Sequence, residues 1–286
     1  MITDVHGLGG IRLAADVDGP EGGPTVVLLH GGGQTRHSWS GTYRVLVDAG
    51  WRALSLDMRG HGDSAWPPDH DYSLEAFSGD VAAVSSTLDQ PPVLVGASLG
   101  GISSMVAVAD AEVQSEVARA LVLVDVSHRV EDSGRERIVE FMTDHLDGFA
   151  SLEDAADAVA AYNPHRPRPS DLDGLRKNLR QNADGRWFWH WDPAFVAGPQ
   201  GSADETRTSV VDPARLSNAA DALAIPTLLV RGRQSDLLSE EGVADFLARV
   251  PTAEFADVAG AGHMVAGDRN EVFNTAILEF LERHRD

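Results

Sequence analysis

The chain has 286 residues, is 43% hydrophobic, and carries 44 acidic against 23 basic side chains, a formal net charge of −21. This size and apolar content allow a full core within one α/β domain, with room for an inserted cap. The acidic balance opposes binding to nucleic acid or to anionic membranes and favours a neutral or apolar small-molecule substrate. The absence of cysteine excludes disulfides, a thiol nucleophile and thiolate metal sites.

Targeting signals are not evident in the sequence. The first twenty residues lack a basic stretch followed by an apolar core, so we expect no signal peptide. No stretch reaches the roughly 18 apolar residues of a membrane span. We therefore expect a cytoplasmic protein that acts on a small molecule without nucleic-acid or membrane partners, and homo-oligomerisation is left open.

The predicted secondary structure alternates between strands and helices. Residues 3–7 and 11–17 form an expected hairpin around the pair Gly9-Gly10. Apolar runs without strict alternation follow, which is typical of strands covered on both faces, and helical stretches separate them. This order predicts a parallel α/β sheet. The expected strands are 25–30, 52–57, 92–97, 120–125, 226–232 and 253–260, and the expected helices are 40–50, 73–88, 99–111, 239–250 and 270–284.

The alternation breaks between residues 131 and 212. We expect an inserted helical lid there, without strands, between core segments 1–130 and 213–286. Three candidate helices include two with caps near Ser151 and Ser170. The stretch "GRWFWHWDPAF" (185–195) is rich in aromatic residues. These rings form either the lid's own core and its seam with the main domain, or an apolar pocket wall. Trp187, Trp189 and Trp191 are the candidates for substrate contact.

The pentapeptide Gly96-Ala97-Ser98-Leu99-Gly100 lies between a predicted strand and a predicted helix. This is the context of the G-x-S-x-G nucleophile elbow, in which a sharp turn exposes the serine hydroxyl. Side chains two residues before and two after the serine would collide with the neighbouring strand and helix, which explains the glycines. We predict Ser98 as a nucleophile; the alternative is a tight turn in which Ser98 merely caps the helix.

The loop "LLHGGGQ" (28–34) follows an early strand. Such a loop supplies a backbone N–H to an oxyanion hole, the other N–H coming from Leu99 after the nucleophile. We assign Gly32 to the oxyanion hole, with its neighbour Gly33 at the substrate. His30 is expected to fix the loop by hydrogen bonding. A phosphate-binding loop is the alternative, but the glycine spacing fits neither common phosphate-binding motif and no lysine follows.

A nucleophilic serine requires a base and an acid that orients the base. His263, in a Gly-rich loop before the last helix, fits the chain order serine, acid, histidine. Asp236, just past the strand ending near residue 231, is the predicted acid, and Asp125, at the end of the preceding strand, is the alternative. Other candidate bases are His61, His128, His190 and His284. "HRPRPSD" and "WHWD" lack convergent ligand spacing, so we expect no metal and no cofactor.

Taken together, "LLHGGG", "LDMRGHGDS", "VGASLGG", "VRGRQSD" and "GAGHM" resemble the α/β-hydrolase superfamily over residues 1–130 and 213–286. The resemblance implies an α/β-hydrolase fold with an eight-stranded, mostly parallel sheet and the triad Ser98, Asp236 and His263 at its C-terminal edge. It also implies that residues 57–64 form a structural turn beside the site. A serine at position 98 departs from the epoxide hydrolases and haloalkane dehalogenases, which use aspartate.

These observations predict a serine hydrolase that cleaves a small, neutral ester or lactone through an acyl-enzyme on Ser98. Two other reactions use the same machinery: hydrolysis of a C–C bond in a meta-cleavage product, and transfer of the acyl group to peroxide by a cofactor-free haloperoxidase. A ligand-sensing protein on the same fold is the non-enzymatic alternative, since fold and triad alone do not prove turnover.

Overall fold

A single eight-stranded sheet lies at the centre of this computed structural model, which describes residues 2–162, 168, 172–197, 212–259 and 271–285. The strands of the sheet are β1 (Ile2–His6), β2 (Arg12–Asp18), β3 (Thr25–Leu29), β4 (Arg52–Leu56), β5 (Val93–Ala97), β6 (Ala120–Val124), β9 (Thr227–Gly232) and β10 (Ala253–Val258).

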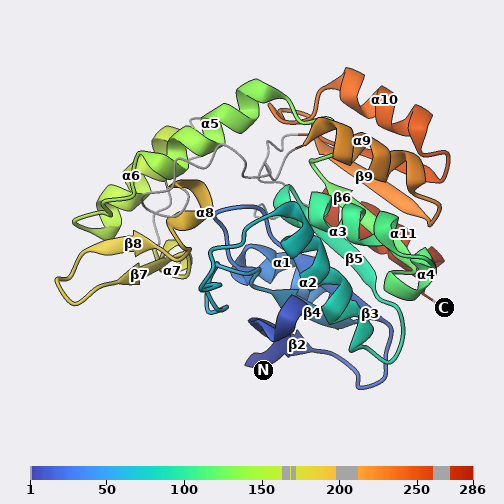
Figure 1. The fold of residues 1–286 in the computed structure, drawn as a ribbon, viewed down its shortest axis with the longest axis horizontal. Coiled ribbons are helices and arrows are strands. Elements are labelled where there is room, and N and C mark those ends of the chain that lie inside the picture. Colours follow the sequence, from blue (N-terminus) through green and yellow to red (C-terminus); the bar gives the residue numbers. More distant parts are fainter. Residues whose placement is uncertain (1, 163–167, 169–171, 198–211, 260–270, 286) are drawn as a thin grey trace.

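The strand order is β1-β2-β4-β3-β5-β6-β9-β10 (Figure 1). β2 pairs antiparallel with both β1 and β4, and every later pair is parallel. The expected fold class, a mostly parallel eight-stranded sheet of the α/β-hydrolase type flanked by helices, is therefore confirmed. Each sequence-predicted strand is present, within one or two residues at its ends.

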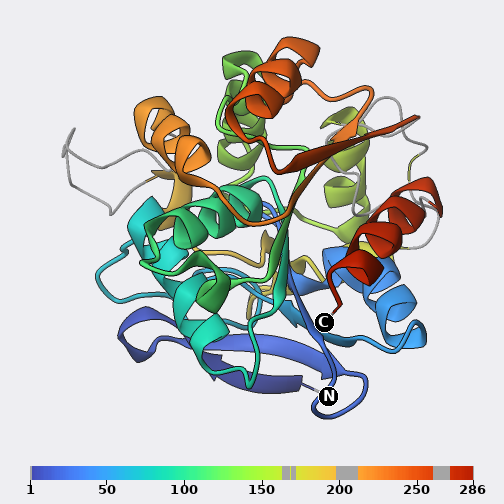
Figure 2. The same ribbon diagram turned by 90° about the vertical axis from the view of Figure 1, so that its right-hand side faces the viewer.

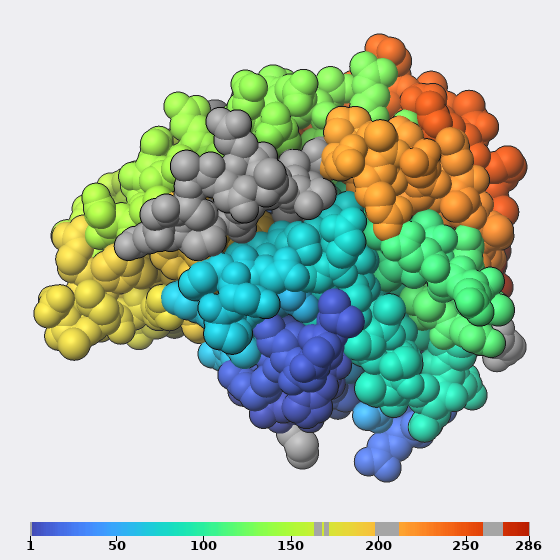
Figure 3. Space-filling view, viewed as in Figure 1, coloured from blue at the N-terminus to red at the C-terminus, as the bar shows by residue number. Residues whose placement is uncertain are grey.

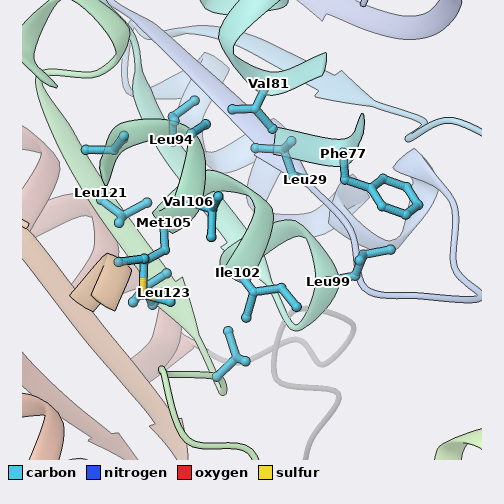
Figure 4. Packing of buried hydrophobic residues seen from close by; sticks show 14 of the residues in the cluster. Leu29, Phe77, Val81, Leu94, Leu99, Ile102, Met105, Val106, Leu121 and Leu123 are labelled. Atoms are coloured by element: carbon cyan, nitrogen blue, oxygen red, sulfur yellow. The ribbon is translucent and has the colours of Figure 1, made fainter. Parts of the chain in front are cut away.

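Both faces of the sheet are covered, which explains why its strands lack polar alternation. In β3, Val27 and Leu29 belong to a core shared with α2 (Leu74–Ser86), α3 (Leu99–Asp110), α9 (Pro213–Ala222) and α10 (Glu240–Arg249). Val26 and Leu28 belong to the opposite core, shared with α1 (Ser40–Asp48) and α11 (Glu271–Arg283). Figure 2 shows these two helix layers on either side of the sheet, and Figure 4 shows the packing of α3 in the first core.

The remaining regular elements of the core are short. They are the 3-10 helices η1 (Leu8–Gly10) and η2 (Arg36–Trp39) and the helix α4 (Gln114–Val117). The helix η1 closes the hairpin of β1 and β2 that the Gly9-Gly10 pair predicted, with φ values of 67° and 80° at the two glycines.

Between β6 and β9 the chain forms a lobe beside the sheet, at the left of Figure 1 and Figure 3. Its rings and aliphatic side chains form a hydrophobic cluster separate from the two cores of the sheet. The lid boundaries 131 and 212 stay predictions. The elements of the lobe are α5 (Asp132–Thr143), α6 (Leu152–Tyr162), α7 (Asp173–Arg176), β7 (Leu179–Gln181), β8 (Trp187–Trp189) and α8 (Ala194–Ala197).

The expectation that the inserted segment has no strands is wrong, because β7 and β8 pair as an antiparallel hairpin. Its turn contains Gly185 at a φ of 81°, a conformation that glycine adopts without strain. The expected cap at Ser151 is present, since its hydroxyl accepts the Asp154 N–H at 3.1 Å. Ser170 lies outside the described residues, and the helix expected there is the single turn α7.

Candidate active site

Ser98 occupies the sharp turn between β5 and α3. Its φ of 46° and ψ of −115° are unusual for a residue with a side chain. Its N–H donates to the Val124 carbonyl at 3.3 Å, and its own carbonyl accepts from Ile102 at 3.0 Å, so strand and helix together hold this conformation. Strained backbone of this kind occurs at functional sites where the surrounding fold enforces it. Ser98 is only partly buried and stands at the N-terminus of α3.

Both glycines of the pentapeptide are sterically required. A Cβ at Gly96 would lie 2.4 Å from the backbone of Gly100, and a Cβ at Gly100 would lie 2.5 Å from the Leu29 carbonyl oxygen. These close approaches bring α3 down onto β5 and β3. The turn therefore has the sharp strand-to-helix geometry that the nucleophile-elbow motif requires, and the Gly100 N–H in the first turn of α3 donates to the His30 carbonyl at 3.1 Å.

The predicted oxyanion loop lies beside the elbow. A methyl group added at Gly31 would lie 3.3 Å from Ser98 Cβ. The Gln34 N–H donates to the Gly31 carbonyl at 3.2 Å and Gly33 has a φ of 75°, so residues 31–34 form a tight turn. Among the described residues, the Gly32 N–H meets no acceptor. It is therefore available to a ligand, whereas the Gly33 N–H is already used by His61.

The predicted base, His263, lies outside the described residues. The four competing histidines have other partners. Both ring nitrogens of His61 are hydrogen-bonded to the backbone, and His128 bonds a carboxylate of α10 at 2.9 Å. His190 lies 3.8 Å from a carboxylate in the turn after β4, and His284 follows α11 and packs on a phenylalanine of that helix. None of these contacts involves the elbow.

The two candidate acids lie in different surroundings. Asp236 is partly exposed, and its carboxylate accepts from Arg137 of α5 at 2.8 Å. Asp125 is 1% exposed. Its Oδ1 accepts the Gly232 N–H at 3.0 Å and its Oδ2 accepts the Ser235 hydroxyl at 2.6 Å. The loop after β9 thus directs a hydroxyl, rather than its neighbouring carboxylate, toward the end of β6.

The three candidate tryptophans of the lobe have different environments. Trp189 is 9% exposed and packs on Phe141 and Phe149 in the lobe's own cluster. Trp191 is also buried and pairs through its backbone with His61 at the seam with the sheet domain. Trp187 is partly exposed, with the Arg176 guanidinium 5.6 Å from its ring centre. The structure does not bring these three rings together around the elbow.

Sequence reasoning missed Phe195, the last aromatic residue of the same segment. Its ring carbon Cε1 lies 3.4 Å from the position of a Cβ at Gly32. Its ring also meets Tyr72 and Phe77 edge-on at 5.7 and 5.9 Å, which joins the lobe to the core. Met142 of α5 reaches 3.0 Å from the position of a Cβ at Gly33. The sequence signal was weak, since a single ring after three tryptophans has no distinguishing spacing.

Within the described part of the chain, no group of three or more histidine or carboxylate side chains is arranged to hold a metal ion. No helix among these residues combines the length and apolar character needed to cross a bilayer.

The model of the alpha/beta hydrolase fold family matches residues 24–269. The chain belongs to this family. It is 31% identical over 253 residues to the esterase Rv0045c of Mycobacterium tuberculosis, covering 86% of this chain and 78% of that protein. It is 28% identical over 263 residues to the 3-hydroxybutyrate-oligomer hydrolase of Cupriavidus necator, covering 88% and 87%. This α/β hydrolase is therefore an enzyme of the hydrolase class.

Solved structures agree with the fold. The structure of E-2-(acetamidomethylene)succinate hydrolase superposes with a TM-score of 0.82 at 23% identity, covering 99% of this chain and all of that one. The structure of the Mycobacterium tuberculosis esterase Rv0045c superposes with a TM-score of 0.75 at 29% identity, covering 99% and 92%. The first likeness, at this identity, concerns the fold alone.

Proposed function

We propose that this α/β hydrolase cleaves a small, neutral carboxylic ester or lactone through an acyl-enzyme on Ser98. The observation that carries the proposal is the strained backbone of Ser98, held between β5 and α3 beside the Gly31–Gln34 turn. A role as a simple helix cap does not explain this conformation, because the Ser98 side chain makes no capping hydrogen bond to α3. The names of the two relatives, an esterase and a hydrolase of hydroxybutyrate oligomers, support ester chemistry.

The proposed reaction has two halves. His263 takes the Ser98 proton as the hydroxyl attacks the ester carbonyl, and the alcohol leaves with that proton. The N–H groups of Gly32 and Leu99 donate to the oxyanion, and the N-terminus of α3 adds a favourable dipole. Water, deprotonated by the same base, then attacks the acyl-enzyme, and His263 returns the proton to the Ser98 oxygen as the acid is released.

The acid of the triad has two candidates, Asp236 and Asp125. The contacts favour Asp125, because its carboxylate is buried and oriented by a hydroxyl and a backbone N–H. The carboxylate of Asp236 already pairs with Arg137 and is 39% exposed. A buried acid stabilises a neighbouring imidazolium more strongly than an exposed one does, since solvent screens the exposed charge.

The surroundings of the loop favour an apolar substrate. The atoms nearest to the Cβ positions of Gly32 and Gly33 belong to Phe195, Leu99 and Met142. These side chains offer no hydrogen bond to a charged group, and the formal net charge of −21 opposes the approach of an anion. Trp187, Trp189 and Trp191 are then proposed to act mainly by shaping the lobe that carries Phe195.

The test is hydrolysis of a short-chain p-nitrophenyl ester by Ser98→Ala. We expect kcat to fall by at least about 10⁴-fold with the fold intact, as for loss of a nucleophile in a triad. Ser103→Ala is the matched control, because its buried hydroxyl bonds only the Leu99 carbonyl within α3. A folded Ser98→Ala enzyme that keeps most of its activity contradicts the proposal.

A further inference from the structure

His61 is a buried histidine for which a triad mechanism has no use. It lies in the turn after β4, is 0% exposed and sits 28 residues away in sequence from Gly33, to which it is bonded. Its Nδ1 lies 2.9 Å from the Arg59 carbonyl oxygen, which can only accept, so Nδ1 carries the proton. The Gly33 N–H donates to Nε2 at 3.1 Å, so Nε2 is unprotonated. The two contacts fix both the neutral state and the tautomer.

His30 has the same arrangement. Its Nδ1 donates to the Gly31 carbonyl at 2.7 Å, and its Nε2 accepts the Met58 N–H at 3.0 Å. The two imidazole rings lie 5.1 Å apart. Burial, the largest cause, lowers the pKa of His30 to about 4 and that of His61 to about 3. Both rings therefore stay neutral at physiological pH, as their hydrogen bonds require.

The two histidines hold consecutive peptide planes. The Gly31 carbonyl, bonded by His30, and the Gly32 N–H belong to one planar trans peptide, so fixing the carbonyl fixes the direction of the N–H. The next peptide is held at its other end by the bond from the Gly33 N–H to His61. The backbone on both sides of Gly32 is thus restrained by a neutral imidazole.

Residues of the lobe pack over His61 and the Gly31–Gln34 turn. The Phe195 ring meets His61 edge-on at 5.0 Å and also lies against Gly32. Trp191 pairs with His61 through its backbone, and the Gly62 N–H donates to the His190 carbonyl at 2.6 Å. The bond between His61 and Gly33 is therefore partly buried, with its imidazole end inaccessible to solvent, which makes it a firmer restraint than a fully exposed bond of the same length.

We propose that His61 is a positioning residue: together with His30 it holds the Gly32 N–H in the direction that an oxyanion on Ser98 requires. The catalytic consequence of this inference rests on the proposed function. The hydrogen bonds of His61 and His30 are observed independently of that function. Preorganised donors act mainly on the transition state. Loss of the His61 acceptor therefore lowers kcat and leaves KM nearly unchanged.

Three variants separate this role from plain packing. His61→Met fills similar space without a nitrogen acceptor, whereas His61→Gln places an amide oxygen near the position of Nε2. His128→Gln is the control, since it alters a histidine of similar burial whose partner is Asp245 on α10. We expect kcat to fall about 100-fold in His61→Met, the effect of losing one oxyanion donor. The kcat of His61→Gln should be at least about tenfold higher than that of His61→Met.

A boronic acid that mimics the tetrahedral intermediate should lose affinity in parallel with kcat, while a product carboxylate should not. The proposal is overturned if folded His61→Met keeps kcat within about threefold of the parent, a change too small for a lost oxyanion donor. Equal losses of kcat in the methionine and glutamine variants also overturn it, because the acceptor would then be irrelevant.

A second measurement needs neither activity nor a folded methionine variant. Nitrogen-15 NMR of the histidine rings in the full chain should show His61 with a protonated Nδ1 and a bare Nε2. The ring should stay neutral down to about pH 5, because its pKa is far lower. A protonated Nε2 overturns the proposal whatever the kinetics show. If Ser98→Ala remains active while the NMR result holds, the proposed function fails and the restraint on the loop stands.

Discussion

Ser98 and Asp125 occupy matching positions on neighbouring strands, each one residue beyond the last register pair of β5 and β6, Ala97 and Val124. Both have left-handed backbone, with φ values of 46° and 53°. Among the non-glycine residues that the structure describes, only His70 shares this feature. Two strained residues side by side at the C-terminal edge of a parallel sheet support the proposal that the reaction takes place at this edge.

Replacement of each candidate acid by its amide distinguishes Asp125 from Asp236. We expect Asp125→Asn to lower kcat by about 10³- to 10⁴-fold, the effect of misorienting the base of a triad. Asp236→Asn should change kcat by less than about fivefold, because breaking an exposed pair with Arg137 has a small energetic effect. The readouts are kcat and the pH profile of kcat/KM. The reverse ranking would assign the role of the acid to Asp236.

A methyl group at the elbow should destabilise the fold. Gly100→Ala places a Cβ 2.5 Å from the Leu29 carbonyl oxygen, so we expect a loss of about 3 kcal/mol in the free energy of unfolding. Gly41→Ala is the matched control: this helical glycine in α1 has open space around the Cβ position, and it should gain about 0.5–1 kcal/mol. Urea denaturation measures both, and equal effects would argue against the packing described here.

The buried imidazoles should make stability depend on pH. The pKa values of His30 and His61 are lowered from 6.5 to about 4 and about 3 in the folded state, so below pH 6.5 the unfolded chain binds protons that the folded chain does not. Stability is complete above that pH and falls as the pH drops toward 4, by about 1.4 kcal/mol per pH unit for each histidine.

His61→Gln supplies the control for this effect. It removes one of the two titrating rings. The difference in unfolding free energy between the parent and the variant should therefore change by about 1.4 kcal/mol per pH unit between pH 6 and pH 4. A difference that is independent of pH in that range would show that His61 is not held neutral.

The lobe is anchored to the core through Asp192. The Tyr72 hydroxyl and the His70 ring nitrogen both contact its Oδ2, at 2.7 and 3.1 Å, and the Ala194 N–H donates to Oδ1 at 2.9 Å. Tyr72→Phe removes one donor from a buried carboxylate and should lower the free energy of unfolding by about 2 kcal/mol. Tyr43→Phe on α1, outside this network, should have a smaller effect. If the two variants match, the anchor carries no special stability.

Sequence patterns predicted the sheet and the sharp turn at Ser98 well because both depend on local properties. Strands covered on two faces appear in the sequence as continuous apolar runs, and positions packed against backbone appear as glycines. The hairpin of β7 and β8 also had a local signal, the Asp184-Gly185 turn, but strands of three residues are too short for periodicity to detect.

The sequence predicted Asp236 as the acid, but it could not show which side chain the loop after β9 directs toward β6. Ser235 and Asp236 are adjacent, and the turn after β9 decides which of them faces β6. The same holds for His61 and Phe195, whose roles come from contacts with Gly33 and Gly32 that are distant in sequence. The order of residues along the chain predicts which residue types a site needs. Long-range packing decides which individual residues of each type reach the site.

The most direct test of an acyl-enzyme on Ser98 is mass spectrometry of the enzyme quenched during turnover of a slowly hydrolysed ester. We expect an acyl group on the peptide that contains Ser98, formed at the rate of the burst phase and absent in Ser98→Ala. Turnover without any adduct on that peptide, or an adduct on a different residue, would contradict it.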